Sequence, residues 1–214
     1  MGELNKILNS DAFKSTKGIL KCVIGKDMDG KEVIFDLRKA PHVLITGDDA
    51  NKNTKYILAI IESLASVSTD KCLALALINM ESSLEKYNSY LYSKASLNDT
   101  LEAIYNEMEN RYEALSKAGK RSIEDYNDSE VCQKMKYIVA VINGYDKLII
   151  SESTDEDLVL RIAQKSRAVG IHLIISAQNN VLPNYLLCNL PTQINSSLYS
   201  NITMQEPKEI QVIE

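Results

Sequence analysis

The chain has 214 residues, of which 45% are apolar and 25% are charged, so it can bury a core and is not an intrinsically disordered protein. With 24 Lys and Arg residues against 29 Asp and Glu residues, its formal charge at pH 7 is −5. This acidic balance argues against duplex DNA binding by bulk electrostatic attraction, which depends on basic contacts to phosphates.

The first forty residues predict an extension followed by a β-hairpin. Residues 1–19 are polar and mixed, which fits a short helix packed on the outside of the domain. Residues 20–24 and 32–35 are apolar runs typical of strands, and the segment 25–30 between them has a glycine at each end. Gly and Asp are common turn residues, so we expect the two runs to pair as a hairpin.

Apolar runs and helical periodicities alternate through the next part of the chain. The helix predicted at 97–118 has the clearest apolar stripe, and Gly119 follows it where a C-terminal cap belongs. Strands are predicted at 41–46, 72–78, 137–142, 171–176 and 192–199, and two further helices at 54–67 and 155–169. This alternation is typical of the α/β class, with a largely parallel sheet and helices on both faces.

No internal repeat, low-complexity tract or long linker interrupts the chain, so residues 1–214 are expected to form a single domain. Its expected parts are an N-terminal extension and hairpin at 1–40, a core at 41–199 and a tail at 200–214. No apolar run approaches the roughly 20 residues of a membrane span, and the N-terminus lacks the pattern of a signal peptide. We therefore expect a cytoplasmic domain with no membrane segment.

Several reactive side chains have structural interpretations. The four cysteines lie far apart without a Cys-x-x-Cys pair, so no metal site or disulfide is expected, and Cys72 is interpreted as a small core residue. His172 lies inside an apolar strand and is interpreted as a structural imidazole with its hydrogen bonds satisfied. Arg161, Lys165 and Arg167 are assigned to a solvated helix face.

The dipeptide Asn143-Gly144 leaves two topologies open. Asn-Gly between two apolar runs is a strong hairpin signal, which would pair residues 137–142 with residues 145–150. The first run does not alternate between apolar and polar residues, however, which favours a central strand covered on both faces. In that topology Gly47 and Asn143 lie on the same edge of the sheet, within about 10 Å of each other.

A strand-to-helix loop is the first candidate site, because parallel sheets bind ligands at the carboxyl ends of their strands. The loop reads Gly47-Asp-Asp-Ala-Asn-Lys-Asn-Thr54. A P-loop has a Gly, four residues, and then Gly-Lys-Ser/Thr. Here Gly47 and Thr54 are correctly spaced, but Lys52 replaces the second Gly and Asn53 replaces the Lys. By itself the pattern also fits an ordinary turn that ends in a helix-capping Thr.

Longer segments carry a wider resemblance that covers roughly residues 8–199. They are residues 25–30 with 35–47, 106–112 with 118–127, 137–142, and 161–178. In this order they resemble the RecA-like motor domain of the FtsK/SpoIIIE family of hexameric, ATP-driven DNA translocases. The resemblance implies a RecA-like P-loop NTPase fold, with a Walker B strand at 137–142 and a polar sensor at Gln178.

The differences from the family pattern fall at the carboxyl ends of the strands, while the bodies of the helices and strands remain recognisable. The family has Gly-Lys, Asp-Glu, Asp-Pro-Lys and Arg-Pro where this chain has, respectively, Lys52-Asn53, Asn143-Gly144, Asn79-Met80-Glu81 and Asn179-Asn180. Random drift would not be confined to the nucleotide pocket in this way. The pattern therefore predicts a degenerate ATPase site.

Each difference removes one part of ATP hydrolysis. Neutral Asn53 cannot offset phosphate charge as a P-loop Lys does, and Asn143 offers Mg²⁺ only an amide oxygen. Gly144 cannot orient or deprotonate the attacking water, and the loss of a general base typically costs about 10²- to 10⁴-fold in rate. Against this, Thr54 could still bind Mg²⁺, and Lys52 is only one position away from the lysine of the motif.

The sites implied by the resemblance follow from these matches. If a nucleotide binds, it is held by loop residues Gly47, Asn51, Lys52, Asn53 and Thr54. Thr54 is then also the ligand for the metal of Mg-ATP. No catalytic group is expected at the Walker B positions Asn143 and Gly144 or at the sensor-like Gln178, and no cofactor is expected.

The sequence thus predicts a non-catalytic assembly or interaction subunit. Its expected partner is a second copy of itself or a related FtsK/SpoIIIE-type subunit, and its binding to duplex DNA is expected to be weak or absent on its own. Two alternatives stay open: an active ATP-dependent DNA translocase that uses Lys52, and a switch that binds a nucleotide without hydrolysing it.

Overall fold

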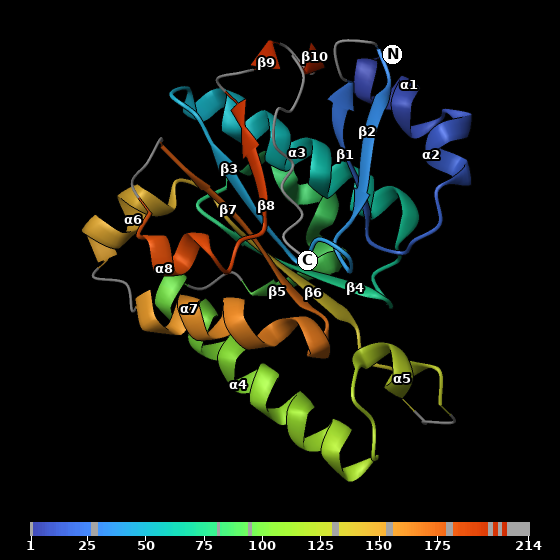
Figure 1. Ribbon diagram of the computed structural model, residues 1–214, viewed down its shortest axis with the longest axis vertical. Coiled ribbons are helices and arrows are strands. Elements are labelled where there is room, and N and C mark those ends of the chain that lie inside the picture. Colours follow the sequence, from blue (N-terminus) through green and yellow to red (C-terminus); the bar gives the residue numbers. More distant parts are fainter. Residues whose placement is uncertain are drawn as a thin grey trace.

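The computed structural model describes residues 2–26, 30–80, 82–93, 96–129, 133–152, 156–178, 182–196, 199–200 and 203–204. A six-stranded sheet runs through its centre (Figure 1) in the order β5-β4-β6-β7-β3-β8, and every neighbouring pair is parallel. The strands are β3 (His42–Thr46), β4 (Leu73–Ile78), β5 (Leu91–Ser93), β6 (Tyr137–Ile142), β7 (Ile171–Ala177) and β8 (Thr192–Asn195). The predicted α/β fold with a mainly parallel sheet is therefore confirmed.

The two central strands are buried along their whole length. All residues of β6 and all residues of β7 are buried, which is why neither strand alternates in sequence. Asn143-Gly144 does not make a hairpin, because the chain continues into helix α6 (Tyr145–Glu152) and β6 pairs in parallel with β4 and β7. The hairpin alternative for residues 137–150 is wrong.

Helices cover both faces of the sheet (Figure 1), because successive strand residues point to opposite sides. Helices α4 (Leu97–Lys117) and α7 (Glu156–Lys165) pack against one alternate set of strand residues, in a core that includes Ile104, Ala140 and Leu173. Helix α3 (Ala50–Val67) packs against the other set, which includes Val139 and Ile174. The apolar stripe of the predicted helix at 97–118 is thus the buried face of α4.

The predicted N-terminal hairpin is confirmed. Strands β1 (Lys21–Lys26) and β2 (Glu32–Asp36) pair antiparallel, and β1 lies against α3, where the Val23 amide donates to the Ser63 hydroxyl over 3.1 Å. Two short helices, α1 (Glu3–Leu8) and α2 (Asp11–Ser15), precede it instead of one. Two short strands near the other end, β9 (Tyr199–Ser200) and β10 (Thr203–Met204), extend this sheet, since β10 pairs with β1.

Several boundaries differ from those predicted. The helix expected at 155–169 ends at Lys165 and continues as a 3₁₀ turn, η2 (Ser166–Val169), to Gly170, whose φ of 73° allows the sharp turn into β7. Cys72 is exposed and precedes β4, so its interpretation as a core residue is wrong.

The sequence did not predict η1 (Ser82–Tyr90), β5, α5 (Ile123–Asn127), α6 or α8 (Asn184–Leu187). Among the described helices, none is long and apolar enough to cross a membrane.

Candidate functional site

The loop that resembles a P-loop joins β3 to α3. Helix α3 begins at Ala50, four residues earlier than predicted, and Asp49 is its N-cap. The Asp49 carboxylate accepts hydrogen bonds from the backbone N–H of Asn51 over 2.8 Å and of Lys52 over 3.4 Å. In a P-loop these first N–H groups of the helix face the phosphates. In this chain a carboxylate already occupies that position, and Thr54 is not the capping residue.

Asn53 is buried, with 2% of its surface exposed, and both ends of its side-chain amide form hydrogen bonds. Its amide nitrogen donates to the carbonyl oxygen of Ala177 at the end of β7, over 3.3 Å. Its amide oxygen accepts from the hydroxyl of Ser196, just after β8, over 2.5 Å. Asn53 therefore ties the first turn of α3 to the ends of the two strands that flank β3.

Gly47 lies directly under this contact. A Cβ atom built on Gly47 would lie 1.9 Å from the Ser196 hydroxyl oxygen and 3.1 Å from the Asn53 amide oxygen. Only glycine fits at this position, because a Cβ atom so close to a buried hydrogen-bonded group cannot be accommodated without a shift. The backbone of Gly47 is thus covered by Ser196 and Asn53, and we call Asn53, Ser196 and the Ala177 carbonyl the Asn53 lock.

A second polar group joins the ends of β6 and β7 to α3. The Asn143 side chain donates to the Thr54 hydroxyl over 3.1 Å and accepts from the Ser176 hydroxyl over 2.7 Å. Thr54 donates in turn to the Ala50 carbonyl over 2.9 Å. Both hydrogen-bonding roles of the Thr54 hydroxyl are therefore occupied. Through Thr54, Asn143 is brought to the edge of the sheet that carries Gly47, as parallel strands require.

Gly144, Gln178 and Asn79 also lie at this edge of the sheet, and each of them forms a hydrogen bond there. Gly144 has a φ of 70°, a left-handed conformation that L-residues rarely adopt, and its N–H donates to the Ser176 hydroxyl over 2.8 Å. The side chain of Gln178 is exposed, while its backbone N–H donates to the buried carboxylate of Asp146 over 3.3 Å. The side chain of Asn79 donates to the Asn143 carbonyl over 2.7 Å.

The structure brings most of the predicted site residues together, but not all. Asn143 and Thr54 share a hydrogen bond, and Asn53 binds separately to Ala177 and Ser196, whereas Asn51 is exposed and Lys52 is half-buried. Glu81, Asn179 and Asn180 lie outside the described residues. Sequence reasoning missed three residues that complete the site, Asp146, Ser176 and Ser196, and it missed the capping role of Asp49. Ser176 carried a signal, as a polar residue at the end of an apolar strand.

The charge of the loop is also unlike that of a polyphosphate site. Asp48 and Asp49 are both exposed at the turn, and Lys52 is the only basic residue of the segment 47–54. Acidic groups at a helix N-terminus stabilise the helix by interacting with its dipole, as Asp49 does here, but they repel an anionic ligand. The arrangement can hold the strand ends together, and it offers an incoming phosphate neither a cationic side chain in the loop's interior nor free N–H groups at Asn51 and Lys52.

Comparisons with known proteins agree with this fold. The FtsK/SpoIIIE family matches residues 3–181. DNA translocase SftA of Bacillus subtilis is 30% identical over 216 residues, covering 94% of this chain and 23% of the relative. DNA translocase FtsK of Campylobacter jejuni is 31% identical, covering 90% of this chain and 22% of the relative. The chain thus spans less than a quarter of the length of these two relatives.

Two solved structures share the fold at lower identity. ATPases 2 and 3 of Thermomonospora curvata EccC, in complex with a signal sequence peptide, match with a TM-score of 0.73 and 19% identity, over 87% of this chain and 37% of that one. The monomeric pCW3 conjugation coupling protein TcpA with ATPγS matches with a TM-score of 0.64 and 20% identity, over 87% of this chain and 56% of that one. At these identities the likeness establishes the RecA-like fold.

Proposed function

The chain belongs to the FtsK/SpoIIIE family, and within it we propose a subunit that does not hydrolyse ATP and that acts by assembling with a second copy or with a related FtsK/SpoIIIE-type subunit. The observation that carries this proposal is the Asn53 lock. Asn53 stands at the position of the P-loop lysine, and its side chain is bound to Ser196 and to the Ala177 carbonyl. A protein group thereby fills the place above Gly47 where a phosphate would be cradled.

The position of Lys52 weighs against the alternative of an active translocase. Successive side chains on an α-helix are rotated by about 100°, and Asn53 already faces the strand ends. Lys52 is therefore turned away from the Asn53 lock by the same angle. The backbone of Gly144 also weighs against an active translocase. A residue with a catalytic carboxylate at this position would have to adopt a φ of 70°, which L-residues rarely do.

Calorimetric titration with Mg-ATP tests the proposal. We expect a dissociation constant no tighter than about 100 μM, because Asn53 stands in place of the P-loop lysine and Asn143 in place of the Walker B acid, and each lost charged contact would contribute about 1.5–3 kcal/mol. Binding at micromolar concentration would refute the role given to the Asn53 lock and would favour one of the two alternatives, the active translocase or the nucleotide-binding switch. In that case a Lys52→Ala variant, with Lys55→Ala as the exposed control one helical turn away, would show whether Lys52 holds the nucleotide.

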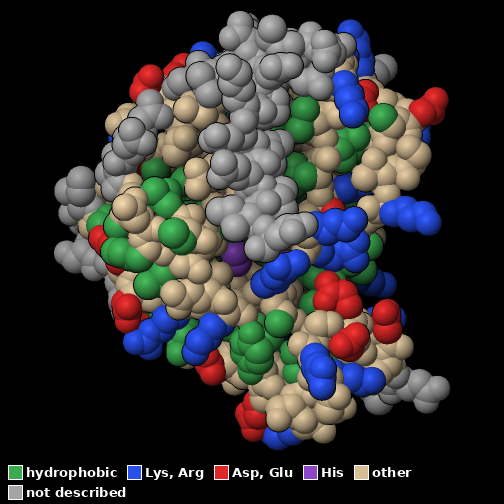
Figure 2. All heavy atoms as spheres, in the orientation of Figure 1, with side chains coloured by type: hydrophobic (Ala, Val, Ile, Leu, Met, Phe, Trp, Pro, Cys, Tyr) green, Lys and Arg blue, Asp and Glu red, His purple; other side chains and the backbone are tan. Residues whose placement is uncertain are grey.

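Duplex DNA binding provides a second, independent test. Both acidic and basic side chains appear on the face of the molecule drawn in Figure 2, in keeping with the charge of −5. By fluorescence anisotropy at about 150 mM salt, we expect the isolated chain to bind a labelled duplex within the non-specific range of about 10⁻⁴–10⁻⁶ M. Mg-ATP should not change this affinity. Nanomolar binding, or binding that ATP strengthens, would favour the translocase alternative.

The proposal also states that the chain assembles with a second copy or with a related subunit, and sedimentation tests this separately. Sedimentation velocity over a range of protein concentrations should reveal a species larger than the 23.9 kDa monomer, either alone or after addition of a purified FtsK/SpoIIIE-type motor domain. The size distribution should be the same with and without Mg-ATP. A chain that remains monomeric in both mixtures at all concentrations would refute the role in assembly.

A further inference from the structure

A hollow of about 390 Å³ opens on the α4 side of the sheet, where β4 and β6 begin. Ala74 of β4 and Ile138 of β6 line it, and both belong to the core that α4 covers. Tyr92 of β5 and Tyr126 of α5 also line the hollow, and both side chains are half-buried against that core. The volume lies in the range of pockets that bind small molecules, so an aromatic side chain has room to enter.

Two lysines, Lys134 and Lys136, line this hollow from the segment that leads into β6. The side-chain alternation of β6 extends back through this segment, because Met135 packs against the core beside α3 and Ile138 belongs to the core beside α4. The two lysines therefore share the α4 face. Asn127 fixes the segment, since its side-chain amide bonds both the N–H and the carbonyl of Met135, over 2.8 and 2.9 Å.

The hollow carries a positive charge that no described acidic residue neutralises. Within the described ranges, neither Lys134 nor Lys136 forms an ion pair, and both side chains are exposed. Glu107 also lines the hollow, but its carboxylate is already bound to Arg111 at 2.7 Å. We call this space the lysine hollow, and its chemistry suits a group that is both aromatic and acidic.

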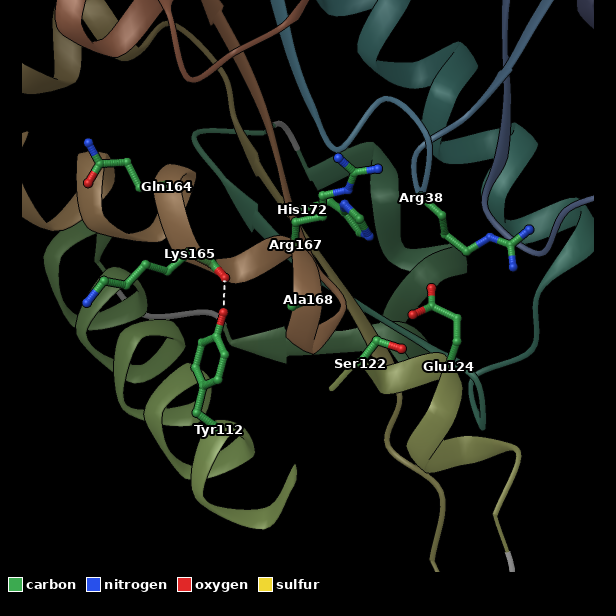
Figure 3. A pocket seen from close by; sticks show the side chains of 9 residues that line it. All are labelled: Arg38, Tyr112, Ser122, Glu124, Gln164, Lys165, Arg167, Ala168 and His172. Carbon is green, nitrogen blue, oxygen red and sulfur yellow. Dashed lines mark hydrogen bonds between the residues drawn. The ribbon is translucent and has the colours of Figure 1, made fainter. Parts of the chain in front are cut away.

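A second hollow, of about 470 Å³, differs in its charges (Figure 3). Lys165 and Arg167 are exposed there, as predicted for a solvated helix face, but their charged groups point in different directions, and Glu124 adds a carboxylate. His172 also lines it, and its Nδ1 lies 2.8 Å from the Pro41 carbonyl, whereas Nε2 has no hydrogen-bond partner among the described residues. The prediction of a fully satisfied His172 is therefore half right, and this second hollow presents no cluster of cations to an acidic group.

An exposed aromatic side chain lies beside acidic groups elsewhere on the molecule. Tyr185 of α8 has 50% of its surface exposed, and its hydroxyl donates to the carboxylate of Glu156 in α7 over 2.6 Å. Glu156 and Asp157 belong to the segment 152–157, which contains four acidic residues and no basic residue. Arg161 pairs with Asp157 at 2.9 Å, so it compensates one of these charges. We call Tyr185, Glu156 and Asp157 the Tyr185 knob.

The Tyr185 knob and the lysine hollow lie on different sides of the molecule. Figure 1 shows α8 and the start of α7 on the left, whereas α5, which contributes to the hollow, lies at the lower right. A chain therefore cannot fill its own hollow with its own knob, but two copies can meet knob to hollow.

We propose that the lysine hollow of one copy receives Tyr185 of a second copy. This inference rests on the proposed function, because it names the surfaces through which a second copy assembles. The ring of Tyr185 packs against the two tyrosines of the hollow, and Glu156 and Asp157 lie opposite its two lysines. An aromatic anchor in a pocket, with complementary charges around it, is a common pattern in protein interfaces.

The contact is heterologous, because it joins two different surfaces. Each copy in a pair keeps one surface free, either its knob or its hollow, so that further copies can add. The native chain should therefore form species larger than a dimer as its concentration rises.

Sedimentation velocity of two variants of the full chain tests this contact. The hollow variant carries Lys134→Glu and Lys136→Glu, and the knob variant carries Tyr185→Ala and Glu156→Gln, with circular dichroism as the check that both are folded. Each variant alone should associate at least about tenfold more weakly than the native chain, because one of its two surfaces is lost. An equimolar mixture should form a dimer and nothing larger, since each variant retains the surface that the other lacks.

Lys14→Glu with Lys17→Glu is the matched control, because both lysines are exposed and the change in charge equals that of the hollow variant. This control should assemble as the native chain does. If the hollow and knob variants also assemble like the native chain, the contact lies elsewhere, so the inference is wrong while the proposed assembly stands. An equal loss in the control, or a mixture of the two variants that remains monomeric, would also overturn the inference. A native chain that stays monomeric at all concentrations would overturn it too, and would leave the proposed function only a related subunit as partner.

Discussion

Acidification from about pH 7 to about pH 5 should lower the free energy of unfolding by about 4 kcal/mol through His42 and His172 alone. Burial lowers the pKa of His42 to about 3, with smaller contributions from the charges of His172 and Arg167. Burial also lowers the pKa of His172 to about 4, against the opposing effect of its hydrogen bond to Pro41. The two imidazoles lie on adjacent strands, with ring centroids 6.2 Å apart.

The sign follows from proton binding in the two states. In the unfolded chain both histidines have a pKa near about 6.5, so below that pH the unfolded state binds more protons than the folded state. Stability from this pair is fully present above about pH 6.5 and is lost as the pH falls toward 4. At pH 5 the pH lies about 1.5 units below the pKa of each histidine in the unfolded chain. Each histidine therefore lowers the free energy of unfolding by about 2 kcal/mol at that pH.

Chemical denaturation at several pH values, with asparagine variants as controls, measures this effect. His172→Asn keeps a side-chain donor for the Pro41 carbonyl, and His42→Asn keeps an acceptor for the Leu173 amide, which lies 3.1 Å from Nδ1 of His42. Each variant should lose about half of the stability change between pH 7 and pH 5. If both variants kept the full pH dependence of the native chain, carboxylates elsewhere would be its cause.

Replacing Asn53 by leucine should destabilise the protein by about 2–5 kcal/mol, because it leaves two buried polar groups without a partner. These are the Ser196 hydroxyl and the Ala177 carbonyl, which Asn53 now satisfies. The volume of the side chain changes little, so the loss is one of hydrogen bonds rather than of packing. Unfolding in urea, with Mg-ATP present or absent, measures it.

A double-mutant cycle separates this explanation from a general effect of the substitution. Adding Ser196→Ala to Asn53→Leu should recover about 1 kcal/mol or more, since removing both partners is less costly than removing one. Asn51→Leu is the matched control, because Asn51 is exposed in the same helical turn, and it should change stability by less than about 0.5 kcal/mol. Additive effects of the two lock substitutions would mean that Asn53 and Ser196 do not act together.

The sequence predicted the central strands well for a physical reason. Residues 137–142 and 171–176 are continuous apolar runs, and such runs are compatible with few environments other than the centre of a sheet covered on both sides. The turn after β6 was ambiguous, because Asn-Gly serves both a hairpin and a left-handed turn into a helix. Only the pairing of β6 with β4 and β7 decides between them.

The candidate site was less predictable, because its partners come from long-range order in the sheet. Asn53 meets Ser196 only because β8 lies next to β3, and nothing local in residues 192–199 indicates that neighbour. The start of α3 could have been read from the sequence, since an Asp before a helical run is a common N-cap. The predicted boundary at Thr54 instead followed the apolar periodicity, whose first apolar residue is Ile57.

Steady-state phosphate release from Mg-ATP, measured with and without duplex DNA, tests most directly whether this subunit is non-catalytic. Thr54→Val is the comparison, because it removes the hydroxyl that a bound Mg²⁺ would need while leaving Asn53 in place. We predict the same background rate for the native chain and for the variant, with no stimulation by DNA. A native rate that DNA stimulates and that Thr54→Val abolishes would contradict the account and establish an active ATPase.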